Sequence, residues 1–331
     1  MSRFKALLVE RKEGESLFSQ QVVERQFDDL PPGDLLIRVR YSSLNFKDAL
    51  SAKGNKGVTR SYPHTPGVDA AGVVEYSGSE LFAAGDEVIV TGYDLGMNTS
   101  GGFSQYIRIP AEWAVPLPRG LNLREAMVLG TAGLTAALCV DKLLKAGMKP
   151  DLGEVFVSGA TGGVGSISVA LLAKLGFDVA ASTGKLEMVD RLIHLGAKNV
   201  VDRDTISEGS DRPMLKETWA GAVDTVGGDI LFNIIKSLKY GGSVACCGMV
   251  ASPNFQANVF PFILRGVNLL GVDSVEQPIE VKQGVWQRLA GEWKLDCLDS
   301  VVSEIPLEAL PDAIELIFRG RAVGRVLVRI D

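Results

Sequence analysis

The feature that most constrains this chain is a glycine-rich turn that joins an apolar strand pattern to a helical pattern. The letters EVFVSG lead into ATGGVG at residues 160–165, and a run of small and apolar residues continues to Gly176. Against the spacing G-x-G-x-x-G, Ala160 takes the first position, Gly162 the second and Gly165 the third. Gly162 would let the backbone approach a diphosphate, Gly165 would let helix and strand pack closely, and N–H groups at the helix start would bind the anion. Because strand, turn and helix follow in this order, the segment predicts a dinucleotide-binding βαβ unit rather than a plain glycine turn.

The end of the next predicted strand indicates which dinucleotide is bound. Ser182 stands where an NAD-binding chain would place an Asp or Glu for the ribose 2′-hydroxyl. Thr183 and Lys185 follow it, and Arg203 comes just after the third strand pattern. Hydroxyls and cations in place of an acid would accommodate a 2′-phosphate, although Asp202 could neutralise the neighbouring arginine. The sequence therefore favours NADPH over NADH.

Hydrophobic patterning divides the chain into two parts. Residues 1–120 carry short β-type runs between Gly and Pro turns, which is typical of a barrel-type β domain. After residue 122 strand and helix patterns alternate, which predicts parallel βαβ units. The strand pattern at 324–330 has no such partner, so we expect it to return to the β domain. The predicted fold is α/β, with a β-barrel domain at 1–123 and 275–331 and a Rossmann doubly wound parallel sheet at 124–274.

The individual elements of the second part follow from the same patterns. Asn122 with Glu125 three residues later predicts a capping box that opens a long helix. Beyond about residue 275 the pattern is mixed, and the chain ends with a strand pattern at 324–330. Strand runs are expected at 154–158, 178–182, 198–201, 222–226, 243–247 and 268–272, and helices at 163–175, 186–195, 229–239 and 260–265.

Composition and charge exclude several classes of function. The formal net charge is −6 and no dense Lys/Arg run occurs, so neither nucleic acid nor a membrane surface is expected as a partner. No 18 consecutive residues are apolar and the first residues lack a secretory h-region, so we expect a cytoplasmic protein without a membrane span. The four cysteines and two histidines lack zinc-site spacings. His64 has no visible catalytic partner and His194 lies near a helix end, so we expect no hydrolase triad.

Several segments resemble one family. The chain is similar to the medium-chain dehydrogenase/reductase superfamily, on its zinc-free quinone oxidoreductase side, in SSLNFKD (42–48), PGVDAAG (66–72), GTAGLTA (130–136) and GAVDTVGG (221–228). PFILRG (261–266) and GVDSV (271–275) resemble the bacterial NADPH-dependent acrylyl-CoA reductase group. The resemblance implies a GroES-like catalytic domain and a Rossmann NADPH-binding domain.

The resemblance also implies that no metal is bound. Zinc alcohol dehydrogenases of the superfamily carry Gly-His-Glu where this chain has Gly67-Val68-Asp69, and a cysteine near the position of Asn45. This chain has no cysteine before Cys139. We therefore expect zinc-independent chemistry.

Site residues are carried over from the family position by position. Close relatives often have Tyr where Phe46 stands, and Phe cannot donate a proton, so packing is the alternative role for this ring. Gly320 can contact a ligand only through its backbone. The candidate catalytic residues are Asn45 and Phe46, which the resemblance supplies, and Asp48, a nearby polar residue for which a structural or solvated role is the alternative. The implied cofactor contacts are Asn45, Phe46, Thr161, Gly162, Gly163, Val164, Gly165, Ser182, Thr183, Gly184, Lys185, Arg203, Met249, Ile263, Ser274 and Gly320.

Three functions remain open. The first is an NADPH-dependent reductase that transfers hydride to the activated C=C bond of a short 2-enoyl-CoA. The second is an NADPH:quinone oxidoreductase, and the third is a non-catalytic NADPH-binding or sensor protein. Lys53, Lys56 and Arg60 could meet CoA phosphates or belong to a solvated loop. The apolar strand at 267–272 resembles one that pairs across subunits, so we expect a homodimer acting on a small-molecule substrate.

Overall fold

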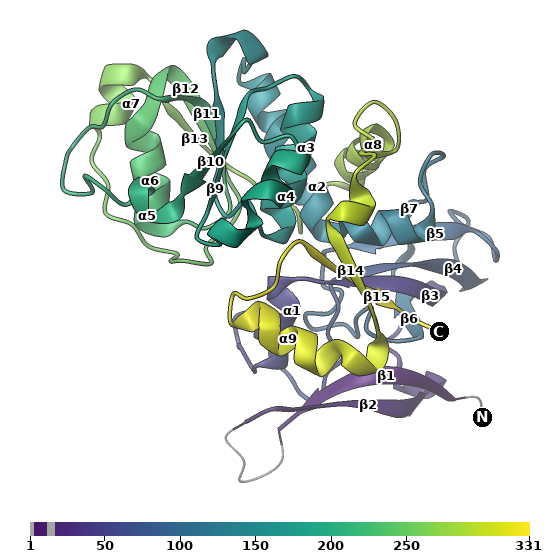
Figure 1. The fold of residues 1–331 in the computed structure, drawn as a ribbon. Coiled ribbons are helices and arrows are strands. Elements are labelled where there is room, and N and C mark those ends of the chain that lie inside the picture. The colour runs from purple at the N-terminus through teal and green to yellow at the C-terminus, as the bar shows by residue number, and fades with distance from the viewer. Residues whose placement is uncertain (1–2, 12–16) are drawn as a thin grey trace. The chain divides into compact units, whose positions relative to one another are not determined.

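The computed structural model describes residues 3–11 and 17–331, and the chain divides into two compact units (Figure 1). The first comprises Met1–Thr131, Val275–Gly291 and Leu298–Asp331, and the second comprises Ala132–Ser274 and Glu292–Cys297. The units therefore change over at residues 131/132 and 274/275, and the short stretch 292–297 belongs to the second. The domain bounds expected at 123/124 and 274/275 remain a prediction.

The first unit is built on β-sheet. Its strands are β1 Arg3–Glu10, β2 Ser19–Gln26, β3 Leu35–Leu44, β4 Asp69–Ser77, β5 Glu87–Thr91, β6 Tyr106–Ile109, β7 Ala114–Pro116, β14 Val302–Pro306 and β15 Arg325–Arg329. A seven-stranded sheet has the order β14-β15-β3-β4-β5-β7, with β6 also paired to β3, while β1 and β2 form a separate pair. Val326 of β15 lies opposite Leu44 of β3, so the last strand returns to the β domain as expected. Alternate residues of β3, such as Leu35 and Ile37, are buried in the core.

Helices cover parts of this unit. They are α1 Phe46–Ala52, α8 Ile279–Ala290 and α9 Leu310–Phe318, and α1 packs against α9. The mixed pattern after about residue 275 did not locate the individual elements α8, β14 and α9. In α8 the buried residues Lys282, Val285, Trp286, Leu289 and Ala290 recur at helical spacing, but the first of them is a lysine, so apolar residues alone mark only part of the buried face.

The second unit is a doubly wound parallel sheet, as predicted. Its strands are β8 Val155–Val157, β9 Val179–Thr183, β10 Asn199–Asp202, β11 Trp219–Asp224, β12 Leu238–Cys246 and β13 Asn268–Gly271. All of their pairings are parallel and the strand order is β10-β9-β8-β11-β12-β13, which reverses between β8 and β11. In this arrangement ligands bind at the carboxyl ends of the strands beside the reversal. The helices of this unit are α3 Gly163–Lys174, α4 Val189–His194, α5 Arg203–Ile206, α6 Gly228–Ser237 and α7 Phe260–Arg265.

Helix α2, Leu123–Lys145, begins with the predicted capping box. Asn122 N–H donates to Glu125 Oε2 at 3.0 Å, and Glu125 N–H donates to Asn122 Oδ1 at 2.8 Å. Gly130 interrupts the helix with φ 51° and ψ −154°. Among the described residues α2 is the helix whose length and composition would suffice to cross a membrane, yet 83% of its most apolar window is buried inside the protein. That burial is what a core helix requires.

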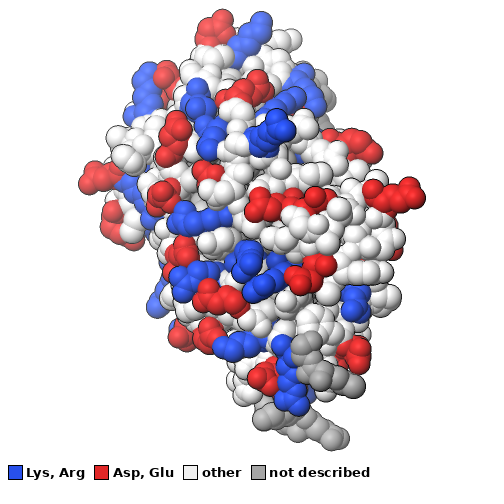
Figure 2. Space-filling view, turned by 90° about the vertical axis from the view of Figure 1, so that its right-hand side faces the viewer, with Lys and Arg blue, Asp and Glu red and all other residues white. Residues whose placement is uncertain are grey.

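Charges of both signs are mixed on the protein surface. Figure 2 shows Lys and Arg interspersed with Asp and Glu over the face it presents, which matches the small formal net charge of −6. No broad area of positive charge covers the described residues on that face.

Candidate functional site

The glycine turn begins where β8 ends and closes at the start of α3. Gly159 has a φ of +58°, and a Cβ at Gly165 would overlap the carbonyl oxygen of Gly159, so both positions need glycine. The first intrahelical bond of α3 runs from Ser166 N–H to the Gly162 carbonyl at 2.9 Å. The N–H groups of residues 163–165 precede that bond, and a helix cannot satisfy them from within. They form a positively polarised backbone cradle of the kind that binds a diphosphate.

The ends of β9 and β10 bring a lysine and an arginine to the same edge of the sheet. Thr183 lies opposite Asp202 in the parallel pairing, so Lys185 and Arg203 follow at adjacent strand ends. The Arg203 guanidinium lies against Gly184, where a Cβ would come within 2.8 Å of Cζ. A side chain at position 184 would therefore displace the arginine.

Hydroxyl groups lie beside Lys185 at the end of β9. Ser182 and Thr183 are buried, and Thr183 Oγ1 lies 3.1 Å from Thr161 Oγ1. Thr183 Oγ1 also accepts from Lys185 N–H at 3.0 Å. Burial lowers the pKa of the Lys185 ammonium, and an anion bound beside it would offset the cost of that burial.

The acids beside Arg203 leave its positive charge largely intact. The Asp202 carboxylate accepts from Asp204 N–H at 3.0 Å and caps α5, so it is not the partner that the sequence suggested. Arg203 Nε lies 3.6 Å from Asp204 Oδ1, and both side chains are exposed. Such a pair is worth little in water, so Arg203 can still attract a phosphate.

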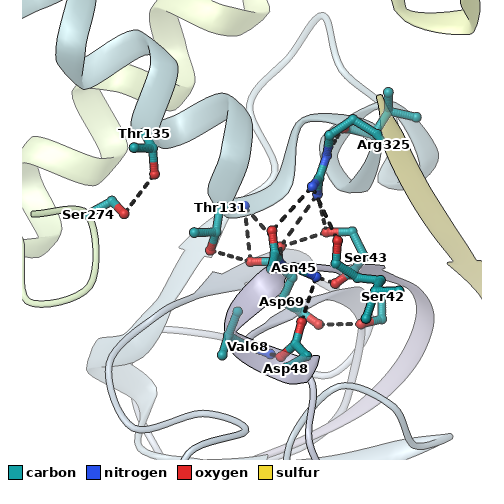
Figure 3. Close-up of polar contacts among 12 residues, drawn as sticks. Ser42, Ser43, Asn45, Asp48, Val68, Asp69, Thr131, Thr135, Ser274 and Arg325 are labelled. Atoms are coloured by element: carbon teal, nitrogen blue, oxygen red, sulfur yellow. Dashed lines mark hydrogen bonds and ion pairs between the residues drawn. The ribbon is translucent and has the colours of Figure 1, made fainter. Parts of the chain in front are cut away.

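The remaining expected cofactor contacts lie in different settings. Met249 follows β12 and is 66% exposed, and Ile263 on α7 is 73% exposed. Ser274 is buried and accepts a hydrogen bond from Thr135 Oγ1 at 2.8 Å (Figure 3). Gly320 ends α9 with a φ of +68° and nothing within 4 Å of its Cβ position.

The three expected catalytic residues lie together at the start of α1. Asn45 is the N-cap, Phe46 is the first helical residue and is half-buried, and the Asp48 side chain reaches back to accept from Asn45 N–H at 2.8 Å. The other Asp48 oxygen accepts from Val68 N–H at 2.9 Å. Burial, and secondarily the neighbouring Asp69 charge, raises the pKa of Asp48 to about 7, against the effect of these two N–H groups.

Beneath this helix start lies a buried cluster centred on Asp69 (Figure 3). Asp69 Oδ2 accepts from Ser43 Oγ at 2.6 Å and from Asn45 Nδ2 at 2.7 Å. Thr131 donates to the same carboxylate twice, from its N–H at 2.9 Å and from Oγ1 at 2.5 Å. The carboxylate is fully buried, so these donors replace its lost hydration.

Arg325, from β15, supplies the positive charge of the cluster. Its Nη2 donates to Ser43 Oγ at 2.7 Å and lies 3.9 Å from Asp69 Oδ2, and its Nη1 donates to Asn45 Oδ1 at 3.2 Å. The second hydrogen of Asn45 Nδ2 is used by the Ser43 carbonyl at 3.1 Å. The Asn45 amide is thereby fixed in one orientation with both of its N–H groups engaged.

The same ion pair closes the break in α2. Arg325 Nε donates to the Val128 carbonyl at 2.9 Å, just before Gly130, while Asp69 accepts from Thr131 N–H, just after it. A Cβ at Gly130 would lie 2.6 Å from Asp69 Oδ2 and 2.8 Å from Arg325 Nη2. The Arg325 guanidinium therefore satisfies a backbone carbonyl at the end of one helical segment, and the Asp69 carboxylate satisfies a backbone N–H group at the beginning of the next.

Known proteins resemble this chain over almost its whole length. Residues 31–119 match the family model of the alcohol dehydrogenase GroES-like domain, and residues 163–291 match that of the zinc-binding dehydrogenases. The chain is 44% identical over 328 residues to "Acrylyl-CoA reductase AcuI" of Ruegeria pomeroyi, covering 99% of each. It is 47% identical over 304 residues to "Putative quinone oxidoreductase YhfP" of Bacillus subtilis, covering 92% of each. The chain belongs to the medium-chain dehydrogenase/reductase family.

Solved structures of this family agree with the fold. Escherichia coli K-12 YhdH with bound NADPH has a TM-score of 0.95 and 42% identity, covering 98% of this chain and 100% of that one. Bacillus subtilis yhfP with NAD bound has a TM-score of 0.96 and 45% identity, covering 100% of both chains. The predicted GroES-like and Rossmann fold and the family resemblance are confirmed.

The residues of this family member do not fit a catalytic zinc ion, despite the name of the matched model. Val68 offers no ligand atom, and the Asn45 amide is bound to Ser43, Asp69 and Arg325. Both Asp69 oxygens accept hydrogen bonds. Across residues 3–11 and 17–331, no group of three or more His, Cys, Asp or Glu side chains could hold a metal ion.

Sequence reasoning missed most of the Asp69 cluster. Asp69 and Arg325 are the first residues of strands β4 and β15, next to apolar residues. A buried charge there needs a partner, so the sequence held a signal but did not indicate the pairing. The turn itself uses Gly159, one residue before the position expected from the fingerprint. His64 Nε2 lies 2.9 Å from the Gly96 carbonyl oxygen, a backbone contact that holds the ring in the fold.

Proposed function

We propose that this protein is an NADPH-dependent reductase of the activated C=C bond in a short 2-enoyl-CoA. The observation that carries the proposal is the backbone cradle of residues 163–165 with Lys185 and Arg203 beside it, in a chain that matches AcuI over 99% of both lengths. AcuI is named as an acrylyl-CoA reductase, and YhdH was crystallised with NADPH. When bound, NADPH supplies the hydride for such a reduction.

The cofactor is assigned to residues by their chemistry. The N–H groups of residues 163–165 would hold the diphosphate, and Ser182, Lys185 and Arg203 would hold the 2′-phosphate. The further contacts proposed from the family resemblance are Asn45, Phe46, Thr161, Thr183, Gly184, Met249, Ile263, Ser274 and Gly320.

The start of α1 positions the reacting groups in this proposal. Asn45 and Asp48 fix the backbone at Phe46, because their polar atoms are bound within the fold. The Phe46 ring, half-buried, would exclude water from one side of the double bond. Phe46 has no proton to give and Asp48 is fully buried, so we propose that solvent protonates the α-carbon after hydride addition. Asn45 and Asp48 would then be positioning residues.

Steady-state rates with acryloyl-CoA and with a benzoquinone, each measured with NADPH and NADH, test the proposal. We expect efficient reduction of acryloyl-CoA with NADPH preferred. A benzoquinone rate far above the acryloyl-CoA rate would favour the quinone oxidoreductase function, which the similarity to YhfP supports. NADPH binding without turnover of either substrate would indicate a sensor.

We also propose a cytoplasmic homodimer. β13 is the edge strand of its sheet and carries the exposed Leu269, and the preceding helix α7 carries the exposed apolar residues Phe260, Ile263 and Leu264. An uncovered apolar edge strand invites pairing, and a second copy would cover it. Light scattering coupled to size exclusion should give twice the chain mass, and a monomer at micromolar concentration would contradict the dimer.

A further inference from the structure

We propose that a basic patch at the C-terminal ends of α1 and α9 binds the phosphate groups of the coenzyme A carrier. The inference rests on the enoyl-CoA reductase function proposed above and adds a binding site to it. The patch consists of the exposed residues Lys53, Lys56, Arg60, Arg319 and Arg321.

The charge of the patch contrasts with that of the whole chain. The segments 53–60 and 315–321 contain five basic residues and one acidic residue, Glu315, although the protein carries a formal net charge of −6. A local excess of one sign raises the concentration of oppositely charged ligands nearby. CoA carries a diphosphate and a 3′-phosphate, so it is the kind of ligand that such an excess attracts.

Direct contacts hold the two segments together. Lys53 Nζ lies 2.5 Å from Glu315 Oε2, and Arg319 Nε lies 2.6 Å from Glu315 Oε1. These two cations lower the pKa of Glu315, which therefore stays ionised and links them. Lys56 Nζ donates to the Arg60 carbonyl at 2.8 Å, which closes the loop after α1. Lys53, Lys56 and Arg319 are thus held in place by contacts of the fold.

The patch also offers what an adenine nucleotide requires. Phe318 is 42% exposed, and Lys53 Nζ lies 5.6 Å from its ring centroid. An aromatic ring among cations suits a base next to phosphate groups. Arg60 and Arg321 are exposed, so their guanidinium groups can reach phosphate oxygens of a ligand.

The length of the CoA arm matches the position of the patch. α1 has seven residues, so its two ends are separated by about 10 Å. Asn45 and Phe46, where we place the double bond, lie at its start, and Lys53 lies at its end. The pantetheine arm has about 13 bonds between sulfur and phosphorus, and at about 3.5 Å for every three bonds it spans roughly 15 Å. A thioester at the start of α1 can therefore reach the patch with its phosphates.

Calorimetric binding of CoA, 3′-dephospho-CoA and pantetheine to the full chain saturated with NADP⁺ tests the patch without any turnover. We expect wild-type protein to bind CoA more tightly than dephospho-CoA, and dephospho-CoA more tightly than pantetheine. Arg60→Ala/Arg321→Ala should weaken CoA binding about tenfold, as expected for two exposed charge pairs, and leave the Kd of pantetheine unchanged. The control Arg119→Ala/Lys216→Ala removes two exposed cations outside the patch and should keep the wild-type Kd for CoA.

The outcomes separate this inference from the proposed function. If Arg60→Ala/Arg321→Ala binds CoA within twofold of the wild-type affinity, the patch does not bind CoA and the inference is wrong. The inference is also wrong if the variant loses NADPH affinity by the same factor as CoA affinity, because the patch would then belong to the cofactor site. If CoA binding depends on the patch while acryloyl-CoA is not reduced, the patch stands and the proposed reaction fails. If acryloyl-CoA is reduced while CoA and pantetheine bind equally, the reaction stands and the patch fails.

Discussion

The glycine turn and the Asp69 cluster are polar sites of opposite construction. The turn uses consecutive residues, 159–165, and its binding groups are backbone N–H donors that the helix leaves unsatisfied. The cluster joins side chains from distant segments, since Ser43 and Arg325 are 282 residues apart, and it satisfies its own polar atoms. The first site is open for a ligand and the second is closed around an ion pair. In this fold, ligand binding therefore relies on a local backbone turn, whereas the stability of the β unit relies on side chains from distant segments.

Removing Asp69 should produce the largest effect. In Asp69→Ala, Arg325 stays buried without its opposite charge, so we expect the free energy of unfolding to fall by about 3–5 kcal/mol in urea titrations. The double variant Asp69→Ala/Arg325→Met removes both charges and should lose less than the single variant. A single variant as stable as wild type would show that the cluster does not support the β unit.

Two glycine substitutions distinguish packing from ligand approach in the turn. In Gly165→Ala the new Cβ meets the Gly159 carbonyl, so stability and NADPH affinity should both fall, the affinity by about a hundredfold. In Gly162→Ala the nearest atom is 3.3 Å away, so the fold should persist while NADPH binds more weakly. Melting temperatures and NADPH fluorescence titrations measure both. Unchanged affinity in Gly162→Ala would contradict the cradle.

Asp48 should make stability depend on pH. Its pKa of about 7 in the fold exceeds the unfolded value of about 3.9, so between these values the folded chain holds a proton that the unfolded chain has lost. The contribution of this group to stability should therefore decrease as pH rises from about 4 to 7, by up to about 1.4 kcal/mol per pH unit. Urea unfolding of wild type and Asp48→Asn across this range should show a flatter profile for the variant. If wild type and Asp48→Asn show the same dependence of unfolding free energy on pH, Asp48 does not titrate in this range.

Removing Arg203, one of the two cations at the ends of β9 and β10, should have the smallest effect. Arg203→Ala removes one exposed cation near the proposed 2′-phosphate, so the preference for NADPH over NADH should fall by about tenfold in kcat/KM. Arg191→Ala, which removes an arginine on α4, serves as the control. If the preference is unchanged in Arg203→Ala, Lys185 and the hydroxyl groups alone discriminate between the cofactors.

These two sites also show what could be predicted from the sequence. The turn was predictable because its strand, glycines and helix are adjacent in the chain, and the parallel sheet followed from the alternating patterns. The Asp69 cluster was not, because the pairing of Asp69 with Arg325 depends on a strand order that no local pattern specifies. Helix α8 was not located because its buried face includes Lys282, which no apolar pattern marks as buried. The resemblance supplied Asn45 as a candidate and its polar chemistry suggested Asp48, but only the contacts show how these side chains are held.

The origin of Arg325 in the final strand determines when the first unit can be completed. A ribosome adding 5–20 residues per second needs roughly 3–10 s to proceed from residue 274 to residue 325. During that interval the Rossmann segment 132–274 is already synthesised, while Asp69 still awaits its counter-charge. Although the β unit starts the polypeptide, it should reach its native state last in the cell.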